Sequence, residues 1–344
     1  MVDILSMELN ELQLFIKELG QPVFRAKQVY DWLHKKLVSD FDEMTNLPKA
    51  LREKLKEESI IQSVNIVDKL VSKTDGTTKY LFVLNNDSII ESVLMRYSFG
   101  NAVCVSTQAG CRMGCTFCAS TINGVECSLT AGEILSQVYA IQKDTGERVS
   151  NVVLMGSGEP FDNYDNVIKF IRILNSKEGL DIGQRHITLS TCGLTEKMRE
   201  LADLKLQITL AVSLHAPNDA IRNTIMPISR KYDFETLLDA CRYYTEKTNR
   251  RITFEYSLIK GVNDSADNAK ELAAKLKGML CHVNLIPVND VKERNYVKSG
   301  VKTIEDFAAI LSGRGIETTI RRELGSDINA ACGQLRKGYM ESRK

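Results

Sequence analysis

Apolar residues in the first sixty positions recur at intervals of three and four, with polar residues between them. The stretches with this pattern are LNELQLFIKELG, RAKQVYDWLHKK and LPKALREKLKEE. The spacing places the apolar side chains on one face of an α-helix, and Gly20 is a helix stop signal. We therefore expect a helical unit over residues 1–60.

Near residue 62 the pattern changes to short extended runs. KYLFVL and SIIESVLMRYS are rich in β-branched and aromatic residues, and Asn85, Asn86 and Asp87 stand between them. Two such runs around a cluster of turn residues predict a β-hairpin. We expect a small β extension over residues 61–100.

From residue 101 onward, extended apolar runs alternate with helical patterns. The extended runs are AVCVST, VVLMGS, HITLST, ITLAVSLH, ITFEYSLI and HVNLIPV, and ETTIRREL closes the series. Strands that alternate with helices indicate βαβ units and a parallel sheet. Six units are fewer than the eight of a closed barrel, so the α/β fold expected for residues 101–344 is a partial (β/α)6 barrel. A doubly wound sheet is the second choice.

A capping-box pattern supports the start of the first barrel helix. Thr130 is followed three residues later by Glu133, the arrangement in which each side chain accepts a hydrogen bond from the other residue's backbone. We expect this helix to begin directly after Thr130.

Composition narrows the class of protein without identifying it. The chain has 344 residues, 43% of them hydrophobic, and a formal net charge of +1, which provides no global field for nucleic acid or membrane. No run approaches 18 apolar residues, and the start is amphipathic and partly acidic, unlike a secretory signal. These features predict a soluble, cytoplasmic protein. Nine cysteines in such a chain indicate reduced thiols used for metal binding, catalysis or packing.

Three cysteines lie close together in CRMGCTFC, directly after the first predicted barrel strand. Cys111, Cys115 and Cys118 could bind three irons of a [4Fe-4S] cluster and leave the fourth iron free for a substrate. The alternative is a zinc ion with Cys127 as its fourth ligand. Zinc is less favoured because the chain has no second pair of cysteines with CxxC spacing.

Polar residues also follow the later strands. The strand ends read GSGEP, STCG, SLHAPND and IPVND. In barrels and open α/β sheets the active site lies at these carboxyl ends, although polar loops follow strands in every such protein. GSGEP is not a dinucleotide-binding motif, because Phe161 stands where the third glycine is required.

These motifs carry a resemblance to a known family. CRMGCTFC and GSGEP resemble the radical S-adenosylmethionine (SAM) superfamily, whose members bind a [4Fe-4S] cluster with SAM at its open iron. Longer stretches resemble its bacterial adenine C2-methyltransferases, which modify both 23S rRNA and tRNA. The stretches are FRAKQVYDWLHKK, FDEMTNLPKALREKL, CVSTQAGC, SLHAPND, HVNLIPVN and DINAACGQLRKG.

The resemblance assigns roles to individual residues. It implies that Cys332 carries the methyl group, that Cys104 resolves the covalent intermediate, and that Glu91 accepts a proton. Gly158 and Glu159 would contact the methionyl ammonium of SAM. The remaining implied SAM contacts are Ser190, Ser213, Leu214, His215 and Asn289.

Several of these residues also have an ordinary structural interpretation. Cys104 lies in an apolar strand, where a buried packing cysteine is common. Glu91 alternates with apolar residues, so a solvated hairpin face would explain it equally well. His215 could be a structural histidine. Three further cysteines are expected in the core: Cys192, Cys241 and Cys281.

The resemblance also implies a mechanism. C2 of adenine is electron-poor, so a radical route is needed: one SAM methylates Cys332, and a second yields the radical that activates this methyl group. The resulting carbon radical adds to C2 and joins the base to Cys332. After loss of the C2 proton, Cys104 attacks the sulfur of Cys332, which frees the methylated base and leaves a transient disulfide. The implied targets are an adenine in the peptidyl-transferase region of 23S rRNA and the tRNA adenosine 3′ of the anticodon. A flavodoxin or ferredoxin type of donor would supply electrons, and a monomer is expected.

Two rival functions remain at this stage. A Cfr-like enzyme would share the fold but methylate C8 of adenine; Pro160 favours C2, whereas Ser157 departs from the commonest C2 pattern. The other rival is a zinc-stabilised RNA-binding protein. The residues themselves indicate RNA binding only weakly: the N-terminal helices mix both charges, and the C-terminal segment has an excess of basic residues that could contact phosphates. From Arg314 to Lys344 there are seven basic and four acidic residues, and the basic ones include Arg321, Arg322, Arg336 and Lys337.

Overall fold

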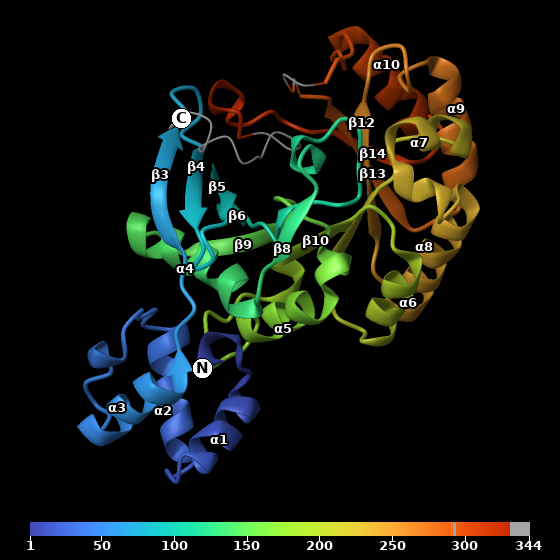
Figure 1. Cartoon of the computed structure of the whole chain (residues 1–344). Helices are drawn as coiled ribbons and strands as arrows, with labels where there is room; N and C mark the ends of the chain where they lie inside the picture. The colour runs from blue at the N-terminus through green and yellow to red at the C-terminus, as the bar shows by residue number, and fades with distance from the viewer. Residues whose placement is uncertain (290, 292–293, 331–344) are drawn as a thin grey trace.

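The computed structural model describes residues 1–289, 291 and 294–330 of the chain. Its N-terminal part is the expected helical unit, which lies beside α4 and α5 (Figure 1). Short strands at both ends of this unit pair in parallel and bring residues 2–3 next to residues 59–60. The elements of the unit are β1 (Val2–Asp3), α1 (Leu9–Glu18), α2 (Phe24–His34), α3 (Lys49–Glu58) and β2 (Ser59–Ile60).

A ten-stranded sheet forms the centre of the molecule, in the order β14-β13-β12-β11-β10-β9-β6-β5-β4-β3. The strands from β6 to β14 in this sheet run parallel, and β3, β4 and β5 extend it in antiparallel fashion. The bounds are β3 (Asn65–Val71), β4 (Thr78–Val83), β5 (Ile89–Tyr97), β6 (Gly100–Cys104), β9 (Val149–Leu154), β10 (Ile187–Thr191), β11 (Thr209–Ser213), β12 (Ile252–Leu258), β13 (Cys281–Pro287) and β14 (Glu317–Ile320).

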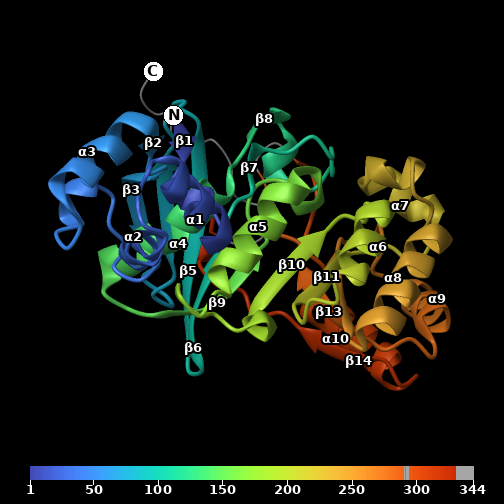
Figure 2. The same ribbon diagram turned by 90° about the horizontal axis from the view of Figure 1, so that it is seen from below.

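Helices follow the parallel strands and cover the outer side of the curved sheet (Figures 1 and 2). They are α4 (Ala131–Thr145), α5 (Tyr164–Leu174), α6 (Thr195–Asp203), α7 (Asp219–Ile225), α8 (Phe234–Thr248), α9 (Ala266–Leu276) and α10 (Val301–Ser312). Six strand–helix units and a closing strand confirm the predicted partial (β/α)6 barrel. The capping box is also confirmed, because Glu133 N donates to Thr130 Oγ1 and Thr130 N donates to Glu133 Oε2. Within the described residues, no helix is long and apolar enough to cross a membrane.

The predicted hairpin consists of β4 and β5, and it is continuous with the barrel sheet because β5 pairs with β6. β3 was not predicted. Its side chains are almost all exposed, so its sequence lacks the alternation of apolar and polar residues by which a half-buried strand is recognised.

The strand register places Glu91 and Cys104 on the concave face of the sheet. Lys79 pairs with Val93, and Val93 pairs with Cys104, so these three side chains lie in one row. Glu91 is two residues from Val93 and therefore points to the same side. It is only 4% exposed. The alternative of a solvated hairpin face for Glu91 is therefore wrong.

Beyond β14 the chain crosses the open side of the barrel and meets the turn between β3 and β4. Gly325 N donates to Asp75 Oδ2 at 2.9 Å, and Lys73 N donates to Asp327 Oδ2 at 3.0 Å. Ala330 packs in a small apolar cluster with Cys104. Cys332, like Arg336 and Lys337, lies outside the described residues.

Candidate active site

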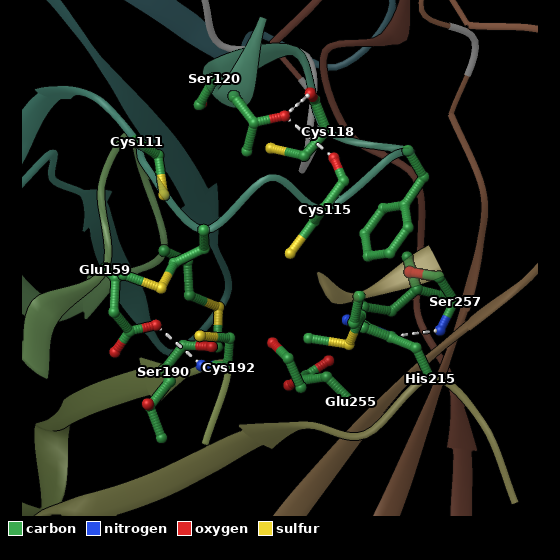
Figure 3. Close-up of a pocket in the computed structure, with 18 of the residues that line it drawn as sticks. Cys111, Cys115, Cys118, Ser120, Glu159, Ser190, Cys192, His215, Glu255 and Ser257 are labelled. Carbon is green, nitrogen blue, oxygen red and sulfur yellow. Dashed lines mark hydrogen bonds between the residues drawn. The ribbon is translucent and has the colours of Figure 1, made fainter. Parts of the chain in front are cut away.

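A cavity opens at the carboxyl ends of the barrel strands, where the sequence predicted an active site (Figure 3). It brings together nearly all of the strand-end residues that the motifs had singled out. Of the predicted residues, those that line it are Cys111, Cys115, Cys118, Gly158, Glu159, Ser190, Ser213, His215 and Asn289.

The three motif cysteines lie at one end of this cavity, on the loop that follows β7 (Gln108–Gly110). This loop needs glycine at position 110, where φ is +76° and a Cβ would lie 2.0 Å from the carbonyl oxygen of Gly124. The pKa of Cys111 is raised to about 12, mainly by burial and to a smaller extent by the nearby Glu159 and Cys118. Cys111 is buried and Cys115 and Cys118 are half-buried, so three thiolates at one end of a cavity would be costly unless a cation is bound there.

The arrangement of the cysteines fits a cluster better than a single ion. Among the described residues, no three His, Cys, Asp or Glu side chains form a group that could hold one metal ion. A zinc ion requires ligands that converge at about 2.3 Å from sulfur, whereas each cysteine of an iron–sulfur cluster binds a separate iron. Cys127 does not line the cavity, and its Sγ contacts Asn86 Nδ2 at 3.4 Å. The geometry therefore does not favour the zinc alternative.

Glu159 is a buried carboxylate with a fixed orientation. Its Oε2 accepts a hydrogen bond from Cys192 N at 2.8 Å, and its Oε1 accepts one from Phe161 N at 3.0 Å. Burial raises its pKa, and these hydrogen bonds oppose the rise. The preceding Gly158 has φ +104°, and a Cβ there would lie 2.7 Å from the side chain of Gln108. Only glycine allows Glu159 to reach this position without strain.

The remaining predicted SAM contacts divide into two groups. Ser190, Ser213 and Asn289 line the cavity, as does His215, whereas the Leu214 side chain is fully buried in the main hydrophobic core. His215 has a positive φ of 55°, and its Nδ1 accepts a hydrogen bond from Ser257 N at 2.9 Å. Burial lowers the pKa of His215 to about 3, so its imidazole is neutral.

Glu255 is a cavity residue that the sequence interpretation missed. It is 5% exposed on β12, and its carboxylate points into the cavity in Figure 3. Its Oε2 accepts a hydrogen bond from Asn284 Nδ2 at 2.9 Å and lies 3.8 Å from Arg321 Nη1. Burial raises the pKa of Glu255, and Arg321 lowers it. The signal was a single acidic residue inside the apolar run ITFEYSLI.

Arg222 is buried next to the cavity and binds the backbone of two segments that follow barrel strands. It is fully buried, and its guanidinium donates to the carbonyl oxygens of Cys192 at 2.8 Å and Leu214 at 3.2 Å. It thereby joins the ends of β10 and β11. Cys192 was expected in the core with Cys241 and Cys281. The other two lie in the main core. Cys192 is also buried, in a second apolar cluster, and in addition it lines the cavity beside Glu159.

Cys104 and Glu91 lie on the same concave surface, outside the residues that line the cavity. Cys104 is 6% exposed and packs against Val93 and Ala330. Glu91 forms an ion pair with Lys79, with 3.4 Å between Oε1 and Nζ. Ala330, which contacts Cys104, precedes Cys332 by only two residues in the sequence.

Comparison with known proteins identifies relatives along the whole chain. Residues 2–61 match the family described as "Ribosomal RNA large subunit methyltransferase N-terminal domain", and residues 105–273 match the radical SAM superfamily. The "Probable dual-specificity RNA methyltransferase RlmN" of Clostridium novyi (strain NT) is 60% identical over 342 residues, which covers 99% of this chain and all of the relative. The protein of the same name from Clostridium perfringens (strain 13 / Type A) is 59% identical over 100% of this chain and 99% of the relative. The crystal structure of a radical SAM methyltransferase from Sphaerobacter thermophilus superposes with a TM-score of 0.94 and 44% identity, covering 98% of this chain and 99% of that one.

Proposed function

This chain belongs to the RlmN family of radical SAM RNA methyltransferases, and we propose that it forms 2-methyladenosine in RNA. The proposed targets are 23S rRNA, in the peptidyl-transferase region, and tRNA, at the adenosine 3′ of the anticodon. The dual specificity named in the relatives supports this choice. The observation that carries it is the meeting of three motif cysteines and the anchored Glu159 carboxylate in one cavity.

The radical SAM superfamily implies a [4Fe-4S] cluster and SAM. We assign the cluster to Cys111, Cys115 and Cys118, and the methionyl ammonium of SAM to Gly158 and Glu159. When bound, these groups supply the one-electron chemistry that an electron-poor ring carbon requires. Glu159 can accept from the ammonium without rearranging, because two backbone N–H groups already fix its carboxylate. The other proposed SAM contacts are Ser190, Ser213, Leu214 through its backbone, His215 and Asn289.

The methyl transfer is assigned to the cysteine pair. In this proposal one SAM would methylate the Cys332 thiolate and a second would provide the radical, so one turnover would use two SAM molecules. Cys104 later attacks the sulfur of Cys332. The resulting disulfide is reset by two electrons from an external donor of the flavodoxin or ferredoxin type. Glu91 is the proposed proton acceptor, and Lys79 beside it would stabilise its carboxylate form. The packing of Ala330 against Cys104 supports the pairing with Cys332.

RNA binding is assigned to the N-terminal unit of residues 1–60, with residues 61–100 as a β extension and residues 101–344 as the catalytic barrel and C-terminal segment. The match of residues 2–61 to an rRNA methyltransferase N-terminal domain supports this division. The unit buries its own apolar residues, including Leu12, Val29 and Leu51. Substituting exposed lysines of this unit should weaken RNA binding without reducing iron content. Unchanged affinity would contradict the assignment.

The decisive experiment is an anaerobic assay of the iron-reconstituted protein, which we expect to be a monomer. The assay contains SAM, a low-potential reductant and an adenine-containing RNA fragment. Mass spectrometry of nucleosides and protein should detect 2-methyladenosine and 5′-deoxyadenosine. Cys332→Ala should abolish the methylated base, and Cys104→Ala should leave RNA attached to the protein. Formation of 8-methyladenosine would instead identify the Cfr-like activity. SAM left uncleaved by protein with a full cluster would refute the proposed mechanism.

A further inference from the structure

The loop that follows β13 contacts the cysteine loop at two points. Arg294 Nη2 donates a hydrogen bond to Thr121 Oγ1 at 3.3 Å. The hydroxyl groups of Tyr296 and Thr116 lie 2.6 Å apart. Thr116 lies between Cys115 and Cys118 in the chain, and Thr121 follows Cys118 by three residues. Both contacts therefore reach the segment that carries these two cysteines.

Thr121 connects Arg294 to the backbone of both cysteines. Its Oγ1 lies 2.9 Å from the carbonyl oxygen of Cys115 and 2.9 Å from that of Cys118. A hydroxyl group has one proton to donate, which these two carbonyls share, and lone pairs that accept from Arg294. Arg294 is therefore linked by hydrogen bonds to the backbone of Cys115 and Cys118 through the single Oγ1 atom of Thr121.

The Arg294 loop is itself held in place. Tyr296 packs against an apolar cluster that includes Met226, beside Cys115 and Phe117. Farther along the loop, Lys260 N donates to the Val297 carbonyl at 2.9 Å, and Ser299 Oγ donates to Asp264 Oδ2 at 2.7 Å. These contacts attach the loop that carries Arg294 to the barrel, so they restrict the position of Arg294.

Within the described part of the chain, Arg294 has no carboxylate ion-pair partner. Its Nε is buried without a hydrogen-bond acceptor in that same part. The Arg294 side chain is half-buried, and its positive charge lies close to the cysteine loop, where charges interact more strongly than in bulk water.

We propose that Arg294 is a positioning residue for the iron–sulfur cluster. Through Thr121 it fixes the backbone of Cys115 and Cys118, and its positive charge favours the reduced cluster, which carries one more negative charge. Hydrogen bonds and charges around the ligands are known determinants of cluster potential. The inference rests on the proposed function, because it requires the cluster assigned above.

The test uses full-length protein reconstituted with iron and sulfide, in four variants: Arg294→Gln, Arg294→Lys, Thr121→Val and Lys298→Gln. Lys298 lies on the same loop and pairs with Glu323, so Lys298→Gln removes a positive charge without touching the cysteine loop. Iron and sulfide per chain are measured first. The midpoint potential is then measured by redox titration with dithionite and mediators, followed by EPR. Circular dichroism checks that each variant is folded.

Arg294→Gln should shift the midpoint potential to a more negative value. Arg294→Lys keeps the positive charge and should therefore have a potential close to that of the wild type. Thr121→Val should lower the iron content or shift the potential in the same direction, and Lys298→Gln should match the wild type. A loss of iron in Arg294→Gln that Arg294→Lys restores would also support positioning. The proposal is overturned if Arg294→Gln and Thr121→Val both keep wild-type iron content and potential, or if Lys298→Gln changes them equally. A wild-type chain that binds no cluster would refute the proposed function instead.

Discussion

Replacing Arg222 by methionine should destabilise the barrel and also lower the affinity of the cavity for SAM. Arg222 is the largest fully buried side chain in the described structure, and its two shortest hydrogen bonds hold the carbonyls of Cys192 and Leu214. Two weaker contacts, at 3.4 Å, reach the carbonyls of Tyr232 and Ser213. Methionine fills similar space but donates no hydrogen bond, so these carbonyls lose their donor.

The expected loss of stability follows from the two short bonds. Each buried carbonyl left without a partner costs about 1–3 kcal/mol, and relief from burying a cation offsets part of the sum. We expect a net loss of about 3 kcal/mol. With about 2.1 cal/mol/K of unfolding entropy per residue over the whole chain, this corresponds to a fall in Tm of roughly 4 °C. Arg222→Lys should be intermediate, because one ammonium cannot replace a planar fork of donors.

Differential scanning calorimetry of the unreconstituted protein measures this effect, and SAM affinity of the reconstituted protein measures its consequence for the cavity. Arg242→Met is the matched control, because Arg242 forms an exposed ion pair with Asp239 on the outer face of α8. Such pairs contribute about 0–1 kcal/mol. An Arg222→Met protein whose Tm equals that of the control would refute the reasoning.

Three further predictions follow from other parts of the structure. Cys118→Ala should reduce iron to well below four per chain, measured by iron analysis and visible absorption, whereas Cys281→Ala should keep full iron. Glu159→Gln should weaken SAM binding, measured by calorimetry, about 10- to 100-fold. The substitution removes a charge-assisted hydrogen bond of about 1.5–3 kcal/mol and turns an amide N–H₂ toward a backbone N–H. Unchanged affinity would exclude Glu159 as the ammonium acceptor. Burial lowers the pKa of His34 to about 3, so the unfolded state binds its proton more readily and stability falls as pH drops below about 6.5. His34 should contribute roughly 2 kcal/mol to the loss between pH 7 and 5, and urea unfolding of His34→Leu should show a correspondingly shallower pH dependence; an identical dependence would refute this.

The order of elements was predictable because the signals for it are local. Each barrel strand is a short apolar run, and each is followed by a helical pattern, so the βαβ rule gives the parallel sheet. That rule also places strand ends together, which is why Cys111 and Glu159 could be expected in one cavity although they follow different strands.

The register within strands explains one refinement of the site. Ser213 and Leu214 were both implied to contact SAM, but successive side chains at the end of a strand point to opposite faces. Ser213 faces the cavity and Leu214 faces the core, so Leu214 can contribute only backbone atoms. This alternation was already present in the sequence ITLAVSLH.

Other parts of the site depend on contacts between distant segments, which no local pattern contains. Arg222 lies on a short helix and resembles a surface arginine in sequence, yet it is fully buried. Arg294 and Tyr296 follow β13, and only the folded chain brings them to the cysteine loop after β7. Their roles depend on how loops pack, and hydrophobic periodicity carries no information on that packing.

Two mostly buried ion pairs lie on the described part of the concave face of the barrel. Lys79 pairs with Glu91 at 3.4 Å, and Arg321 lies 3.8 Å from Glu255. Pairing limits the cost of burying such groups, which would otherwise be several kcal/mol per ion. It also means that these pairs add no net field to a chain whose formal charge is +1. These two pairs therefore provide no net positive charge for the proposed binding of RNA phosphates, which would rest on basic residues that are not paired in this way.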